Sequence, residues 1–251
     1  MIPALILIAA AQAGSAATTA PTDTALKQRY DTCVELATGD DPAAGLRDAT
    51  SWRLNRGRYF ARQCEGIANA NLAQWPSAAE AFQDAAREAE AAKDVRAANY
   101  WAQAGNAWFM AGDTAKARAA LDAALANPAL AGLLRGEAEL DRARVLASGG
   151  DRPGARTAID RAIELAGDDP LTWLLSATLA RQMGDLPRAK ADIGQALRRS
   201  ADDPSVQLEA GNIAAATGDE MGAKTAWAQV VRLRPDSPQA KSAEAALAQF
   251  D

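Results

Sequence analysis

The 251-residue chain has no histidine, only 5% aromatic residues and only two cysteines. Without histidine it lacks the commonest general base and the commonest metal ligand. Two cysteines without histidine cannot complete a zinc site. The sequence also contains no nucleophile elbow, Walker phosphate loop or dinucleotide-binding glycine motif. We therefore expect no catalytic residue, no cofactor and no metal site, and we predict that the protein is not an enzyme.

An excess of positive charge is absent too, because the formal net charge is −5. Nucleic-acid-binding proteins usually carry a basic face, so no nucleic-acid partner is expected. Most acidic residues stand beside lysine or arginine, as in "AREAEAAKDVR" and "LDRARVL". That spacing is typical of solvent-exposed helix faces.

No apolar run is long enough to span a bilayer. The first residues, "MIPALILIAAAQAGSAATTAPTDTA", combine the apolar run Ile2–Ala11 with small residues at Ala11-Gln12-Ala13. This is typical of a secretory signal peptide, although no lysine or arginine follows Met1. We predict that residues 1–20 are a signal peptide cleaved near Ala13 or Ala16, which gives a periplasmic or secreted protein without a membrane span in the mature chain. The alternative is a disordered apolar tail that stays attached to a cytoplasmic protein.

Alanine dominates what is present and is by far the most frequent residue of the chain. Alanine is the best helix former, and β-branched and aromatic residues are sparse, so the composition predicts an all-α fold. Small side chains also allow helices to approach closely, which suits thin stacked layers.

Short phrases recur at a fixed interval along the chain. Asp168-Asp169-Pro170 returns at Asp202-Asp203-Pro204, and Gly184-Asp185 returns at Gly218-Asp219. In this register three units of equal length follow one another without a gap, at 136–169, 170–203 and 204–237. The unit before them, 98–135, is longer because it contains the insertion "NPALAGLLR". A fixed period of about 34 residues indicates a stacked helical repeat.

The recurring phrases read as helix boundaries. Glycine closes a helix cheaply in the left-handed conformation, and the following aspartate can cap the next helix. We predict these roles for Gly112, Gly150, Gly184 and Gly218 and for the aspartates that follow them. We interpret the paired carboxylates as caps rather than as a catalytic or calcium site.

Within each unit, small residues alternate with large apolar ones. Position eight is Gly105, Ala143, Ala177 or Gly211, and position twenty-four is Leu121, Ile159, Ile193 or Trp227. Interdigitated helix packing requires such alternation. With the "AGN" segments and the recurrent Gly-Asp pair, the pattern resembles the tetratricopeptide repeat family.

The resemblance implies a right-handed α-solenoid of stacked helix-turn-helix units. It covers residues 98–251 strongly, as the four units above and a C-terminal capping helix at 238–251. It covers 25–97 weakly, as two degenerate units in which Gly39-Asp40 and Pro42 mark one boundary. No linker rich in proline or serine interrupts the chain, so one continuous stack is expected.

Cys33 and Cys64 are expected in the first helices of consecutive units. Since such helices run side by side, the two sulfurs could meet, and an even pair in an exported protein favours a disulfide. The alternative is two buried thiols that never pair.

The family's concave groove implies a protein-interaction scaffold that holds a peptide or helix of a partner protein, in the bacterial cell envelope if the chain is exported. Alternatives are a cytoplasmic adaptor resembling a co-chaperone, or an enzyme or solute-binding protein built on helical repeats. Some apolar groove positions could instead pack against the next repeat. Carried over by position, the resemblance places these residues in the groove: Asn99, Asn106, Phe109, Met110, Leu140, Arg144, Leu171, Leu174, Thr178, Arg181, Gln182, Leu208 and Asn212.

Overall fold

The computed structural model describes residues 23–249, and within that range the chain forms thirteen helices and no strand. The predicted signal peptide lies outside the described residues. The helices are α1 (Asp23–Thr38), α2 (Pro42–Leu54), α3 (Arg58–Asn71), α4 (Trp75–Ala91), α5 (Ala97–Met110), α6 (Thr114–Ala126), α7 (Gly132–Ser148), α8 (Arg152–Ala166), α9 (Pro170–Gln182), α10 (Leu186–Arg199), α11 (Pro204–Ala216), α12 (Glu220–Leu233) and α13 (Pro238–Leu247).

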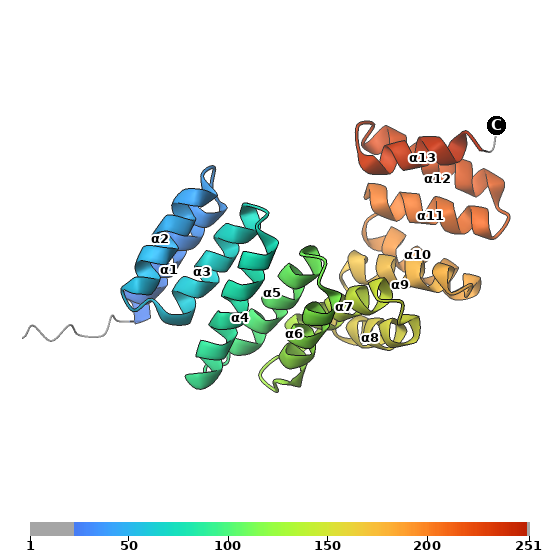
Figure 1. Ribbon diagram of the computed structural model, residues 1–251. Helices are drawn as coiled ribbons and strands as arrows, with labels where there is room; N and C mark the ends of the chain where they lie inside the picture. The colour runs from blue at the N-terminus through green and yellow to red at the C-terminus, as the bar shows by residue number, and fades with distance from the viewer. Residues whose placement is uncertain (1–22, 250–251) are drawn as a thin grey trace, which may run out of the picture.

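The helices stack in chain order as antiparallel pairs, and each pair packs on the next. The helix axes turn from steep at α1–α5 to nearly horizontal at α11–α13, so the stack is curved (Figure 1). α13 closes the stack by burying Ala240 and Ala243 against Trp227 and Val230 of α12. The predicted all-α solenoid is confirmed.

The predicted left-handed glycines and aspartate caps of the repeating units are confirmed. Gly112, Gly150, Gly184 and Gly218 all have φ between +78° and +84°. After each of them an aspartate accepts a hydrogen bond from a backbone amide of the next helix, as Asp185 does from Arg188 at 3.1 Å. The carboxylates of Asp169 and Asp203 cap α9 and α11 in the same way.

Two boundaries differ from prediction. α2 is capped by Asp41 rather than by the Gly39-Asp40 pair, and Gly39 does not take the left-handed conformation. α7 begins at Gly132, before the expected unit boundary at Gly136. Part of the insertion therefore lengthens α7, while Leu130 before it is buried among Ala98, Ala124 and Ala138.

Small residues allow the paired helices to touch. A Cβ on Gly211 would lie 2.4 Å from Cδ1 of Trp227, and one on Gly105 would lie 2.5 Å from Cγ of Leu121. Gly66 of α3 has the same relation to Phe82 of α4, again at 2.5 Å. The alternation predicted from the regular units thus extends into the degenerate ones.

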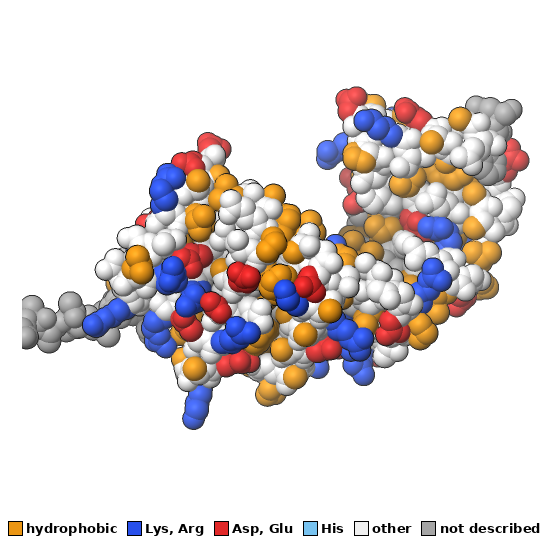
Figure 2. Space-filling model, in the orientation of Figure 1, with side chains coloured by type: hydrophobic (Ala, Val, Ile, Leu, Met, Phe, Trp, Pro, Cys, Tyr) orange, Lys and Arg blue, Asp and Glu red, His pale blue; other side chains and the backbone are white. Residues whose placement is uncertain are grey.

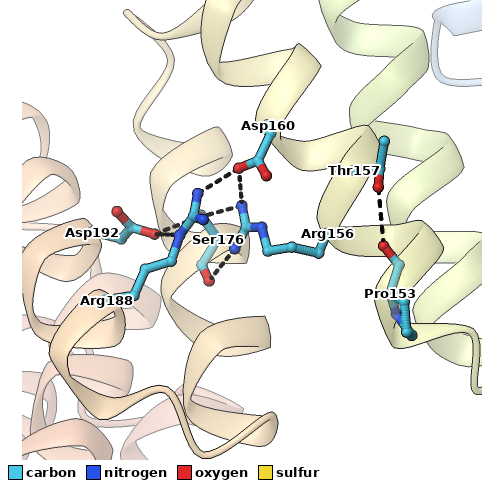
Figure 3. A network of polar contacts seen from close by, with 7 residues as sticks. All are labelled: Pro153, Arg156, Thr157, Asp160, Ser176, Arg188 and Asp192. Atoms are coloured by element: carbon cyan, nitrogen blue, oxygen red, sulfur yellow. Dashed lines mark hydrogen bonds and ion pairs between the residues drawn. The ribbon is translucent and has the colours of Figure 1, made fainter.

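Polar networks reinforce the contacts between successive pairs. Arg156 of α8 donates to the Ser176 hydroxyl of α9 at 2.8 Å and lies 3.1 Å from Asp160. Arg188 of α10 joins Asp160 to the buried Asp192, which also accepts from Ser176 (Figure 3). Three consecutive helices across a repeat boundary are thereby fixed to one another.

Charges of both signs are interspersed on the outer surface over α4, α6 and α8 (Figure 2). Many of them pair between helices, as Arg62 does with Asp84 and Glu88 and Arg142 with Asp122. Over residues 23–249, no helix combines the length and the apolar character needed to cross a bilayer.

Candidate partner-binding groove

A hollow of about 690 Å³ lies along the first helices of the N-terminal pairs. It extends across α1, α3, α5 and α7, and only Arg96 and Leu130 of its lining stand just outside these helices. The volume is in the range typical of ligand-binding clefts. Its lining consists of Leu26, Lys27, Tyr30, Phe60, Gln63, Arg96, Asn99, Tyr100, Ala102, Gln103, Asn106, Leu130, Leu134, Glu137, Ala138 and Asp141.

Amide side chains follow the hollow from one helix to the next. The Tyr30 hydroxyl donates to Gln63 at 2.8 Å, and the Gln63 amide donates to Gln103 at 3.1 Å. Further along, the Asn106 amide donates to the Asp141 carboxylate at 2.6 Å. Because an amide both donates and accepts, this row can hydrogen-bond either edge of an extended peptide backbone.

Aromatic rings form the α1–α3 end of the hollow. Tyr30 and Phe60 meet edge to face with centroids 6.1 Å apart. The Arg96 guanidinium lies 4.4 Å from the centre of the Phe60 ring and pairs with Asp94. The hydrogen bonds from Arg96 hold the pKa of Asp94 well below its usual range. The positive charge of Arg96 is therefore neutralised by Asp94.

Tyr100 completes the aromatic wall on α5. It is 2% exposed, and its hydroxyl has no hydrogen-bond partner among the described residues. Burial raises the pKa of this hydroxyl far above its usual value of 10.0.

The α7 end of the hollow is acidic. Asp141 is half-buried, and this burial raises the pKa of its carboxyl although Asn106 and Arg144 oppose the shift. Arg144 approaches Asp141 to only 3.3 Å and is 41% exposed. Glu137, one turn earlier on α7, is exposed.

A disulfide lies behind the aromatic end. Cys33 of α1 and Cys64 of α3 are both fully buried and are bonded to each other. They pack with Ala37, Ala49 and Ala68. The bond joins the two helices that carry Tyr30, Phe60 and Gln63, so it fixes one wall of the hollow.

Of the residues predicted for the groove, Asn99 and Asn106 line this hollow. Phe109 and Arg144 lie beside it and contact each other, with the guanidinium 5.5 Å from the ring centre. Met110, Leu171 and Gln182 are exposed.

The prediction for Leu140 is wrong. This side chain is 4% exposed and packs with Leu146, Ile159 and Leu179 in the core between α7, α8 and α9. In α7 the neighbouring residue, Asp141, faces the hollow instead.

Most of the predicted groove residues of α9 and α11 have partners within the stack. Arg181 holds the buried Glu209 with two hydrogen bonds of 2.7 and 3.1 Å. Asn212 donates to Glu209 at 3.3 Å and accepts from Trp227 at 3.2 Å. Thr178 donates to the carbonyl of Leu174, while Leu174 and Leu208 pack against core clusters. These side chains hold the stack together and are less available to a partner.

Sequence reasoning missed Gln63, Tyr100, Gln103 and Asp141. Positions two and nine of the repeat identified Asn99 and Asn106 on α5, and Tyr100 and Gln103 of the same helix also line the hollow. Asp141 was interpreted as part of the solvated face "LDRARVL", which is wrong for this residue because it is half-buried and bonded to Asn106. Arg144 follows Asp141 at the i+3 spacing that is common for ion pairs on exposed helix surfaces, so the sequence pattern does not indicate that Asp141 is buried.

Comparison with protein-family models and with curated proteins finds no match. Solved structures do match. PilW, a widely conserved type IV pilus biogenesis factor, has a TM-score of 0.73 at 18% identity, over 88% of this chain and 99% of PilW. PilF of Pseudomonas aeruginosa has a TM-score of 0.67 at 16% identity, over 88% of this chain and 98% of PilF.

YrrB, described as a TPR protein with an unusual peptide-binding site, has a TM-score of 0.56 at 16% identity, over 78% of this chain and 96% of YrrB. At these identities the likeness concerns the fold. The chain is a curved stack of helix pairs with the tetratricopeptide-repeat fold.

Proposed function

We propose that this protein is a non-enzymatic interaction scaffold that holds an extended peptide or a helix of a partner protein in the hollow along α1, α3, α5 and α7. The observation that carries the proposal is the composition of that hollow. Amide, aromatic and acidic side chains from the first helices of four successive pairs converge on one cavity of about 690 Å³. Peptide recognition combines backbone hydrogen bonding with pockets for side chains, and this lining offers both.

The partner site belongs to the N-terminal half rather than to the whole concave face. In α9 and α11 the Arg181–Glu209 pair and the Asn212 hydrogen bonds already satisfy the polar side chains. Breaking the Arg181–Glu209 ion pair to admit a ligand costs more free energy than exchanging the neutral Tyr30–Gln63 and Gln63–Gln103 hydrogen bonds of the hollow.

The bacterial cell envelope is the compartment we propose. The signal-like first residues support export, and a disulfide favours an oxidising compartment. The fold likeness to PilW, a pilus biogenesis factor, is compatible with envelope assembly, but this support is an analogy between folds.

Crosslinking in the native host, followed by identification of the captured proteins, tests the proposal. We expect Gln103→Leu and Asn106→Ala to reduce partner recovery at least tenfold, because both remove hydrogen-bonding groups from the hollow. Arg181→Ala is the matched control on α9, and it should retain the partner. Thermal unfolding of each variant checks that it is folded.

Equal partner recovery with wild type and both hollow variants would contradict the proposal. Loss of the partner with Arg181→Ala alone would move the site to the C-terminal half.

A further inference from the structure

Negative charge exceeds positive charge at the acidic end of the hollow. The Glu137 side chain forms no ion pair or hydrogen bond with any residue of the described range. Asp141 has the Asn106 amide at 2.6 Å and one arginine, Arg144, at 3.3 Å. Arg144 also makes a cation–π contact, in which its guanidinium carbon lies 5.5 Å from the centre of the Phe109 ring. Two carboxylates thus line the same hollow with little compensating positive charge.

We infer that this end of the groove binds the cationic side chain of a lysine or arginine in the partner peptide, between Glu137 and Asp141. The inference rests on the proposed function and names the chemistry that the groove selects. Asp141 has only the partly exposed Arg144 to balance its charge. A half-buried carboxylate is unfavourable unless it is well paired, and a cation from the ligand provides a second partner. The long apolar stem of such a side chain can lie along Leu130 and Leu134, which line the same end.

A second observation comes from the aromatic end of the same hollow, where the Tyr100 side chain lies near Tyr30, Tyr59 and Arg96. The Tyr100 hydroxyl is buried in the wall without a hydrogen-bond partner among residues 23–249. Buried polar groups are nearly always hydrogen-bonded in folded proteins. A peptide carbonyl or amide at this wall would supply the partner that the protein alone does not provide.

The opposite end of the hollow shows why the preference should be for a cation. Its positive groups are already paired, Arg96 with Asp94 at 2.5 Å and Lys27 with Asp31 at 2.5 Å. An acidic ligand group would find no free cation there and would meet repulsion at Glu137 and Asp141. The arrangement therefore discriminates by charge as well as by shape.

The test uses three sets of blocked hexapeptides with random flanking residues and lysine, norleucine or glutamate fixed at the third position. Each set is passed over the immobilised protein, and the retained peptides are counted by mass spectrometry. Norleucine keeps the stem of lysine and lacks its charge, so it isolates the electrostatic contribution. We expect at least tenfold greater retention of the lysine set than of either other set.

Glu137→Gln with Asp141→Asn should abolish the lysine preference while retention of norleucine peptides persists. Glu164→Gln, which removes one exposed carboxylate from α8, is the control and should leave the preference unchanged. Thermal unfolding shows whether the double variant is folded.

The experiment distinguishes failure of the charge preference from failure of the proposed groove. Equal retention of the lysine and norleucine sets would overturn the inference alone, provided that Gln103→Leu still reduces retention. N-acetyl-lysinamide that competes as well as the hexapeptides would contradict a peptide ligand and indicate a small amine. Retention of no set, or retention that Gln103→Leu does not change, would overturn the inference and the groove together.

Discussion

The first two helix pairs, α1–α4, and the last two full pairs, α9–α12, have the same architecture but use different residues to build it. In α9–α12 glycines close the first helices, at Gly184 and Gly218. After α3 the corresponding left-handed position is Ala73, and Lys93 takes the same conformation after α4, each with φ of +56°. The irregular half therefore carries backbone strain that the regular half avoids.

The concave faces differ as well. Arg181 of α9 and Asn212 of α11 both bond to Glu209 of α11, whereas α1, α3 and α5 leave a hollow with an unpaired Tyr100 hydroxyl. The regular units of α9–α12 use their polar residues to hold the stack, whereas the candidate site spans the degenerate units and the two units that follow them, at 98–135 and 136–169.

Loss of the disulfide should have the largest effect on stability. This effect should be confined to the N-terminal half of the stack. We expect Cys33→Ala with Cys64→Ala to lower the stability of α1–α3 by about 3–4 kcal/mol, because the bond closes a loop between residues 31 apart. In a stack each pair contacts only its neighbours, so α9–α12 should keep their protection. Amide hydrogen exchange of both halves measures this.

Amide exchange that accelerates equally in all helices would contradict the expectation that the disulfide stabilises only its own end of the stack. Unchanged exchange in α1–α3 would mean that the bond does not support this end of the stack.

Overpacking should destabilise both halves alike, because in both halves a glycine on one helix faces a large side chain on the next. Gly66→Ala and Gly211→Ala would place a Cβ 2.5 Å from Phe82 and 2.4 Å from Trp227. We expect each to lower the free energy of unfolding by about 1–3 kcal/mol. Urea unfolding provides the measurement.

Gly194→Ala is the control, since the nearest atom to its added Cβ is Nη1 of the flexible Arg198 side chain at 3.6 Å. It should stabilise α10 by about 0.5–1 kcal/mol. Similar effects of all three alanines would refute the packing argument.

Substitutions at the left-handed turn positions should change stability in opposite directions in the two halves. Gly184→Ala forces a side chain into φ of +80° and should cost about 1 kcal/mol. Lys93→Gly relieves the same constraint and should gain somewhat less than that, because glycine also loosens the unfolded chain. Opposite shifts in thermal unfolding support the account, and shifts of the same sign would contradict it.

The smallest effect on stability is expected at Asp141. Burial raises the pKa of this carboxyl above its usual value of 3.8, so the folded protein binds the proton more tightly than the unfolded chain. Its ionisation therefore costs stability, and this cost appears as the pH rises above about 4. Asp141→Asn should slightly stabilise the free protein at neutral pH while it weakens peptide binding.

Unfolding curves at pH 4 and pH 7 check the sign, because the advantage of Asp141→Asn should be larger at pH 7. A variant that is less stable at pH 7 than at pH 4, relative to wild type, would show that the charge is stabilising.

Much of the fold could be predicted from the sequence because it depends on local chemistry. Glycine at a left-handed position, aspartate at a cap and a small residue opposite a large one each carry a fixed meaning within one or two turns. The longer α7 and the cap at Asp41 were missed because insertions move boundaries that a period alone places evenly.

The site was less predictable. Asn99 and Asn106 follow from the repeat register, but Gln63 and Gln103 join them only through contacts between helices that are 40 residues apart in sequence. The burial of Asp141 and Leu140 depends on how α7 rotates against its neighbours, and no spacing rule within the helix contains that information.

Photo-crosslinking from two positions tests the central claim most directly. A photoreactive amino acid is placed at Asn99, in the hollow, or at Gln182, exposed at the end of α9. Illumination in the native host should join a partner protein to position 99 and leave position 182 unmodified. Adducts at 182 without adducts at 99 would place partner binding in the regular half and contradict the account.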